Sequence, residues 1–116
     1  MNIQIYGTNK CFDTKKAQRY FKERNIKFQF VDLAKFGMSK SEYKSIKTAL
    51  KCSLEDLVNE KSKKYEQSFI KYLASEEAKE EKLLENQELF KTPIIRNGKK
   101  ATLGYCPEIW KEWEKE

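Results

Sequence analysis

Strand-forming sequence occurs only near the two ends of the 116-residue chain, and a long helical stretch separates them. At the N-terminal end, residues 2–6 alternate polar and apolar side chains and stop at Gly7, which predicts a short strand followed by a turn. Residues 13–24 place apolar side chains at helical spacing, and residues 28–31 predict a second strand. Two strands that are joined by a single helix form a parallel pair. This end of the chain therefore predicts a β-α-β unit.

The middle of the chain, residues 39–88, has helical patterning and contains no proline. Ser39 and Ser53 are each followed three residues later by an acidic residue, which is typical of helix N-termini. The apolar positions that come after each serine keep helical spacing. We therefore expect three or four short helices in an insert that covers about residues 39–90.

After the insert, two β-prone runs flank Asn97-Gly98, which predicts a hairpin of two antiparallel strands. Pro107 then opens a last helix. The whole order is β-α-β, helical insert, β-β-α. This order predicts an α/β, thioredoxin-like fold with a four-stranded mixed sheet and helices on both of its faces.

Composition excludes several classes of protein. The chain contains no histidine, which argues against a metal site and against a catalytic triad. No apolar run approaches the roughly 18 residues that cross a membrane, and residues 1–10 do not resemble a signal peptide. Three cysteines at wide spacing argue against the disulfide framework of a secreted module. We expect one cytoplasmic domain over residues 1–116, without a membrane partner.

Positive charge is concentrated in the first half of the chain. Residues 1–50 carry 11 basic and 4 acidic side chains, out of 24 basic and 18 acidic in total. This excess attracts anionic partners. Direct nucleic-acid binding is not expected, because the basic side chains of residues 13–24 lie on a helix that must cover the sheet and no base-reading element is present.

Cys11 lies between the strand that ends at Gly7 and a helix that begins near Phe12. Unpaired backbone N–H groups and the positive end of the helix dipole meet at this point and favour a thiolate over a thiol. Three basic residues add positive charge nearby: Lys10, Lys15 and Lys16. Cys11 is therefore a candidate nucleophile. The alternative is a small, buried apolar side chain without a chemical role.

Two segments carry a resemblance to a known family. YGTNKC followed by FDTKKAQRYF, and later TPIIRNGKKATLGYCPEIW, are similar to the cysteine loop, first helix, hairpin and last helix of the arsenate reductase and Spx family. The resemblance implies that Cys11 is the nucleophile. Pro93 stands where thioredoxin-like proteins place a cis-proline facing the active cysteine. FDTKKA is most similar to a branch of single-cysteine thiol reductases that depend on glutathione, which would be a co-substrate and not a bound cofactor.

The chain departs from the family at the three arginines with which arsenate reductases bind their oxyanion. Lys61, Thr92 and Cys106 occupy these positions, and none of them reproduces the planar fork of arginine. Arsenate reduction is therefore not expected, and a small thiol or disulfide is the expected substrate. The candidate residues for binding this substrate or its anionic groups are Thr8, Asn9, Lys10, Thr14, Lys15, Lys61, Thr92 and Pro93.

The other two cysteines leave alternatives open. If the family fold holds, Cys106 lies near the active loop and is a candidate resolving thiol for a mixed disulfide at Cys11. The alternative is that Cys106 packs beneath the last helix and has no redox role. Cys52 opens a helix of the insert, and a filler role in the packing suits it better than a resolving role.

A second function class within the family is the Spx-type regulator, which binds the C-terminal domain of the RNA polymerase α-subunit. The chain resembles these regulators at Gly104 and Tyr105. However, Thr14 stands where many of them carry the second cysteine of a CxxC switch, and Ser53 stands where they use a glycine. A thiol reductase is therefore the first interpretation, and a regulator is the alternative.

Overall fold

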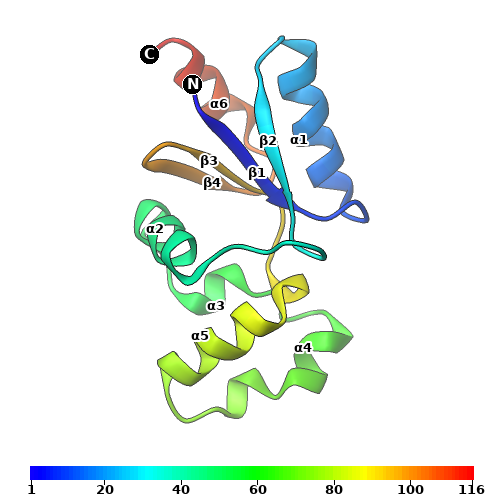
Figure 1. The fold of residues 1–116 in the computed structure, drawn as a ribbon, viewed down its shortest axis with the longest axis vertical. Coiled ribbons are helices and arrows are strands. Elements are labelled where there is room, and N and C mark those ends of the chain that lie inside the picture. Colours follow the sequence, from blue (N-terminus) through cyan, green and yellow to red (C-terminus); the bar gives the residue numbers. More distant parts are fainter.

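The computed structural model describes residues 1–116 and contains one four-stranded sheet (Figure 1). The strands, in the spatial order β2-β1-β3-β4, are β1 (Ile3–Gly7), β2 (Phe28–Asp32), β3 (Ile94–Asn97) and β4 (Lys100–Leu103). β1 and β2 pair in parallel, whereas β3 pairs antiparallel with both β1 and β4. The predicted α/β fold with a mixed, thioredoxin-like sheet is confirmed.

The hairpin turn lies one residue further along the chain than the sequence predicts. Asn97 pairs with Lys100, so the two central residues of the turn are Gly98 and Lys99. Gly98 has a φ of +60°. A two-residue hairpin with glycine at its first central position needs this left-handed conformation, so the register follows the glycine.

One face of the sheet is covered by the helices α1 (Phe12–Glu23) and α6 (Pro107–Glu114). Their apolar side chains recur at helical spacing and meet the sheet in one buried cluster, which comprises Ile3, Ile5, Ala17, Tyr20, Phe21, Ile95, Trp110 and Trp113. Trp110 Nε1 donates a hydrogen bond of 2.8 Å to Thr102 Oγ1, so the buried indole N–H is satisfied. This packing fixes the two helices side by side.

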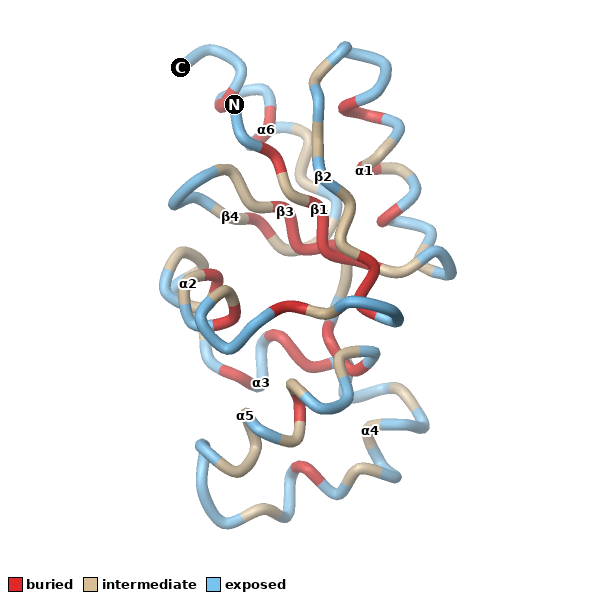
Figure 2. The backbone as a smooth tube through the Cα atoms, in the orientation of Figure 1, coloured by how far each residue is buried: buried red, intermediate tan, exposed pale blue.

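The opposite face of the sheet carries the insert, which begins with α2 (Lys40–Leu50) and extends along the long axis of the molecule (Figure 1). α2 begins with the predicted capping box of Ser39 and Glu42. The Glu42 carboxylate also accepts a hydrogen bond of 2.6 Å from Tyr6 Oη, which ties α2 to β1. Figure 2 shows that the buried residues of the sheet lie mainly in β1 and β3 and that further buried residues occur in the insert.

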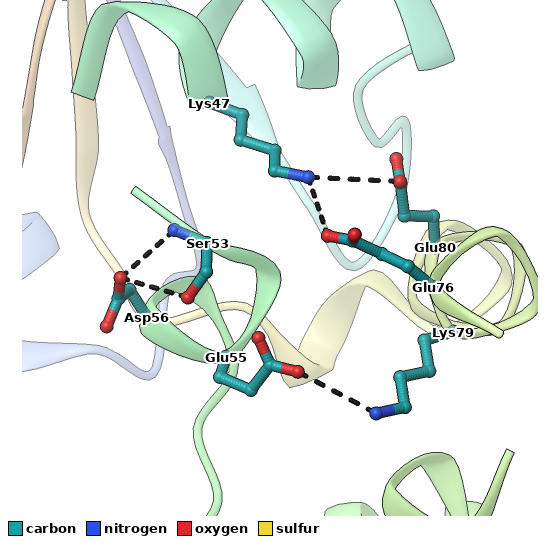
Figure 3. Close-up of polar contacts among 7 residues, drawn as sticks. All are labelled: Lys47, Ser53, Glu55, Asp56, Glu76, Lys79 and Glu80. Atoms are coloured by element: carbon teal, nitrogen blue, oxygen red, sulfur yellow. Dashed lines mark hydrogen bonds and ion pairs between the residues drawn. The ribbon is translucent and has the colours of Figure 1, made fainter. Parts of the chain in front are cut away.

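The remaining elements of the insert are short, as the sequence predicts. They are α3 (Leu54–Leu57), α4 (Lys63–Ser68), α5 (Glu76–Glu85) and the 3-10 turns η1 (Ile70–Tyr72) and η2 (Gln87–Leu89). Figure 3 shows how ion pairs join α5 to its neighbours: Lys47 Nζ lies 2.9 Å from Glu76 and 3.9 Å from Glu80, and Lys79 Nζ lies 3.7 Å from Glu55. Such partly exposed pairs contribute at most about 1 kcal/mol each to the free energy of unfolding. The insert is therefore stabilised mainly by apolar packing.

The insert is fastened to the segment that leads into β3. Val58 and Phe90 form an isolated antiparallel bridge, with a backbone hydrogen bond of 2.7 Å on each side of it. The chain around Val58 therefore lies beside the segment that leads to Thr92, and Lys61 follows three residues later. No helix of the structure combines the length and the apolar character that crossing a membrane requires.

Candidate active site

Cys11 is the residue that directly precedes α1, at the N-cap position of the helix. β1 ends at Gly7, and the loop closes with a hydrogen bond of 3.2 Å from the Cys11 N–H to the Thr8 carbonyl. The Cys11 carbonyl then accepts the first helical hydrogen bond, from the Lys15 N–H at 3.2 Å. The thiol is half-buried and stands where the N–H groups of the first helical turn have no helical partner.

Thr14 packs against the end of β1, close to Gly7. A Cβ atom at Gly7 would lie 2.4 Å from Thr14 Oγ1, so the threonine approaches this closely only because glycine has no side chain. Thr14 is fully buried, and its hydroxyl has no hydrogen-bond partner. A buried hydroxyl without a partner costs about 1–3 kcal/mol, which a nearby thiolate acceptor would relieve.

The segment before β3 faces Cys11. Cys11 Sγ donates a hydrogen bond to the Thr92 carbonyl at 3.6 Å. The peptide bond between Thr92 and Pro93 is cis, and the Pro93 carbonyl accepts a hydrogen bond of 2.8 Å from the Gly104 N–H. This segment is therefore held between the cysteine loop and the end of β4.

The pKa of the Cys11 thiol lies below its ordinary value. Burial raises this pKa, but the hydroxyls of Thr14 and Thr92 and the backbone N–H groups of Thr14 and Asp13 stabilise the thiolate by more. At neutral pH, Cys11 is therefore ionised to a larger extent than an ordinary cysteine. A thiolate is the nucleophilic form of the side chain.

Residues 6–113 match the model of the ArsC family. This chain belongs to the ArsC family. Among curated proteins, it is 26% identical over 115 residues to YusI of Bacillus subtilis, an uncharacterized protein, and the match covers 97% of this chain and 98% of YusI. The family resemblance of the two chain ends is thereby confirmed.

Solved structures share the fold of this ArsC-family chain. The arsenate reductase from Vibrio cholerae is similar with a TM-score of 0.85 and 21% identity, and the similarity covers 97% of each chain. A protein described as YFFB is similar with a TM-score of 0.78 and 17% identity over 96% of this chain and 97% of that one. At these identities the likeness establishes the thioredoxin-like fold, and the chemistry has to be argued from the site.

In this ArsC-family protein the two other cysteines favour the protonated form. Cys106 precedes α6 and its thiol donates a hydrogen bond of 3.3 Å to the Leu103 carbonyl. Burial raises the pKa of Cys106, and the Glu108 carboxylate raises it further. Cys52 lies between α2 and α3, and burial and Asp56 raise its pKa. All three cysteines are free, and the resolving role of Cys106 stays a prediction.

The predicted binding residues fall into two groups. Thr14 and Thr92 act on the Cys11 thiol, and Pro93 lies buried next to Thr92. The side chains of the second group make no hydrogen bond to the thiol: Thr8, Asn9, Lys10, Lys15 and Lys61. No lysine is among the leading causes of the lowered pKa of Cys11. Whether the second group binds substrate stays a prediction.

Two aromatic side chains that contact Lys16 are not predicted as site residues from the sequence. Phe12 is 74% exposed and Tyr105 is 38% exposed. Lys16 Nζ lies 5.7 Å from the ring centroid of Phe12 and 4.7 Å from that of Tyr105. The first contact has a sequence signal, because Phe12 and Lys16 are four residues apart on one helix. The second depends on how α6 packs beside α1, and no local pattern encodes it.

Proposed function

We propose that this ArsC-family protein is a thiol–disulfide oxidoreductase in which the Cys11 thiolate is the nucleophile. The observation that carries the proposal is the lowered pKa of a half-buried cysteine at the N-terminus of α1, facing the segment that contains Thr92 and Pro93. Thiolate character and access together determine how reactive a cysteine is. Three free thiols also suit a reducing compartment such as the cytoplasm.

The proposed reaction reduces a mixed disulfide of glutathione and a second thiol. The Cys11 thiolate attacks the glutathionyl sulfur, the substrate's S–S bond breaks, and the second thiol leaves as a thiolate that takes up a proton. The protein then carries a Cys11–glutathione disulfide. A second glutathione thiolate attacks the glutathionyl sulfur of this disulfide, which releases oxidised glutathione and regenerates the Cys11 thiolate. Glutathione is thus a co-substrate, and its negative charge suits the basic N-terminal half of the chain.

Arsenate reduction is not part of the proposal. The arsenate reductases that this chain resembles carry arginine at three positions. In this chain, those positions hold Lys61, Thr92 and Cys106. Arginine holds an oxyanion with two parallel N–H donors, whereas lysine offers a point charge and threonine and cysteine offer no charge. The Cys106 thiol, moreover, donates to the Leu103 carbonyl.

Thr14 also favours a reductase over a regulator with a two-cysteine switch. It fills a fully buried position behind the loop and supports the Cys11 thiolate, at the point where a switch would need its second thiol. Association with the RNA polymerase α-subunit remains the alternative. Its test is a pull-down with the purified C-terminal domain of that subunit, in which we expect no retention of the protein.

The test of the proposed function is glutathione-coupled reduction of a glutathione mixed disulfide by the wild-type protein and by Cys11→Ser. We expect turnover by the wild type and a loss of more than about 100-fold in the variant, because a serine hydroxyl is not ionised at neutral pH. Cys52→Ser is the matched control and should retain the activity. A wild-type protein as inactive as Cys11→Ser would contradict the proposal.

The role of Cys106 has a separate test. If glutathione regenerates Cys11, Cys106→Ser keeps its turnover, and mild oxidation in the presence of glutathione yields Cys11 linked to glutathione. If Cys106 is the resolving thiol, mass spectrometry after mild oxidation finds a Cys11–Cys106 disulfide. The raised pKa of Cys106 favours the first outcome, because a protonated thiol attacks slowly.

A further inference from the structure

A groove runs between α1 and α6 and begins about one turn from Cys11. Its volume is about 350 Å³, and its walls include Lys16, Arg19 and Glu23 from α1 and Tyr105 and Lys111 from the loop before α6 and from α6 itself. The packing of Tyr20 on Trp110, with ring centroids 5.1 Å apart, holds the two walls in place.

Part of the α1 wall belongs to a stripe of side chains that starts at Phe12. Phe12, Lys16, Arg19 and Glu23 follow one another at spacings of four, three and four residues, which places them on one side of the helix. Phe12 is the residue directly after Cys11. A molecule whose sulfur reaches Cys11 can therefore continue along this stripe into the groove.

The groove carries unpaired positive charge. Lys16, Arg19 and Lys111 form no ion pair in the structure, and the carboxylate of Glu23 forms none either. Arg24, at the far end, lies 3.8 Å from Glu114. The free cations outnumber the one acidic lining residue, so the groove attracts anions.

The ammonium group of Lys16 contacts two aromatic rings. It lies over the rings of Tyr105 and Phe12, and Tyr105 in turn packs edge-on against Trp110 with ring centroids 5.4 Å apart. Cation–aromatic contacts of this kind direct an ammonium group without neutralising it. Lys16 therefore places its positive charge between these two rings, at the end of the groove nearest in sequence to Cys11.

We propose that the groove between α1 and α6 binds the carboxylate-bearing part of a small thiol or disulfide substrate while its sulfur reacts at Cys11, with Lys16 and Arg19 as the residues that select for negative charge. This inference rests on the proposed function and names its substrate class. Phe12 and Tyr105 supply apolar contact on either side of Lys16.

The test compares two aromatic disulfides that differ in charge. The dianionic 5,5′-dithiobis(2-nitrobenzoate) and the neutral 2,2′-dithiodipyridine each react with the Cys11 thiolate, form a mixed disulfide and release one equivalent of an absorbing thiol or thione. Rates are measured by absorbance in a Cys52→Ser, Cys106→Ser background, so that the signal comes from Cys11. This stoichiometric reaction needs no turnover, so it can fail or succeed independently of the proposed function.

We expect Lys16→Met with Arg19→Met to slow the dianionic reagent about three- to tenfold and to leave the neutral reagent nearly unchanged. The difference should shrink in high salt, which screens the charges. The matched control is Lys22→Met with Lys27→Met, which removes two positive charges outside the groove and should change neither rate appreciably. Circular dichroism checks that each variant is folded.

Two outcomes would overturn the proposal. Equal slowing of both reagents would mean that Lys16 and Arg19 act on the Cys11 thiolate itself, and slowing of the dianionic reagent by the control pair to the same degree would mean that overall charge is sufficient. If selectivity for the dianion is present and lost in the groove variant while no glutathione-coupled turnover is found, the groove stands and the proposed function fails.

Discussion

Cys11 and Cys106 occupy the same position in two helices, yet their thiols behave oppositely. Each residue directly precedes the first residue of a helix, and both helices cover the same face of the sheet. The pKa of Cys11 is lowered and the pKa of Cys106 is raised. Both side chains are half-buried, and burial raises both pKa values, so burial does not explain the difference.

Hydrogen-bond donors explain the difference between the two thiols. At α1, the N–H groups of Asp13 and Thr14 and the Thr14 hydroxyl stabilise a thiolate. At α6, no donor is among the causes of the Cys106 pKa: the thiol donates to the Leu103 carbonyl, and the Glu108 carboxylate adds negative charge. A helix N-terminus alone therefore does not make a cysteine reactive. The donors that the first turn presents to the sulfur decide the outcome.

The largest expected effect is the difference in alkylation between the two cysteines of the wild-type protein. At pH 7, we expect iodoacetamide to modify Cys11 several-fold faster than Cys106, because only the thiolate reacts and the two pKa values are shifted in opposite directions. Peptide mass spectrometry at several times and pH values measures both rates. The midpoint for Cys11 should fall below that of an ordinary thiol and the midpoint for Cys106 above it. Equal alkylation rates would show that the thiols of Cys11 and Cys106 do not differ in pKa.

The second prediction concerns the position of Thr14. In Gly7→Ala the new Cβ would lie 2.4 Å from Thr14 Oγ1, so the loop or the helix must shift. We expect a loss of about 1–3 kcal/mol in the free energy of unfolding, as for overpacked cores, together with slower alkylation of Cys11. Urea denaturation measures the first effect. The double variant Gly7→Ala with Thr14→Ala should recover part of the stability, and a Gly7→Ala protein as stable as the wild type would show that the contact is not tight.

Much of the fold follows from local sequence signals, because each element carries its own. The strand that stops at Gly7, the capping box at Ser39 and the proline that opens the last helix are all local patterns. The hairpin turn lies one residue later than the sequence predicts. The register depends on which residue adopts the left-handed conformation, and that residue is Gly98. The pairings of β1 with β2 and of β3 with β4 follow from the β-α-β and hairpin rules, whereas the pairing of β1 with β3 joins segments far apart in the sequence.

The candidate site could be predicted only in part. The position of Cys11 at a helix N-terminus follows from the sequence pattern around it. The cause of its lowered pKa does not, because the lysines that the pattern emphasises are not among its leading causes and two threonine hydroxyls are. Likewise, Tyr105 reaches Lys16 only after α6 has packed beside α1. Contacts between elements distant in sequence leave no local signal.

The third prediction isolates one donor. Thr14→Val keeps the shape of the side chain and removes the hydroxyl, so the pKa of Cys11 should rise and its alkylation at pH 7 should slow about three- to tenfold. At a pH where Cys11 is protonated, the free energy of unfolding should stay the same or increase, because the buried hydroxyl then has no partner. Thr14→Ser is the control that retains the hydroxyl. Unchanged alkylation in Thr14→Val would assign the lowered pKa to the remaining donors.

The smallest expected effect is at the other helix, where Glu108→Gln removes the charge that faces Cys106. Because Glu108 is a secondary cause after burial, the pKa of Cys106 should fall modestly, and its alkylation at pH 8 should speed up by less than about threefold. A raised pKa in the folded state stabilises the protein below the ordinary thiol pKa of about 8.5 and ceases to do so as the pH rises through the folded value. Glu108→Gln should therefore lose less stability than the wild type between pH 8 and pH 10. If Cys106 in the Glu108→Gln variant were instead alkylated as fast as Cys11, the Glu108 carboxylate alone, and not the set of donors, would account for the difference in pKa between the two cysteines.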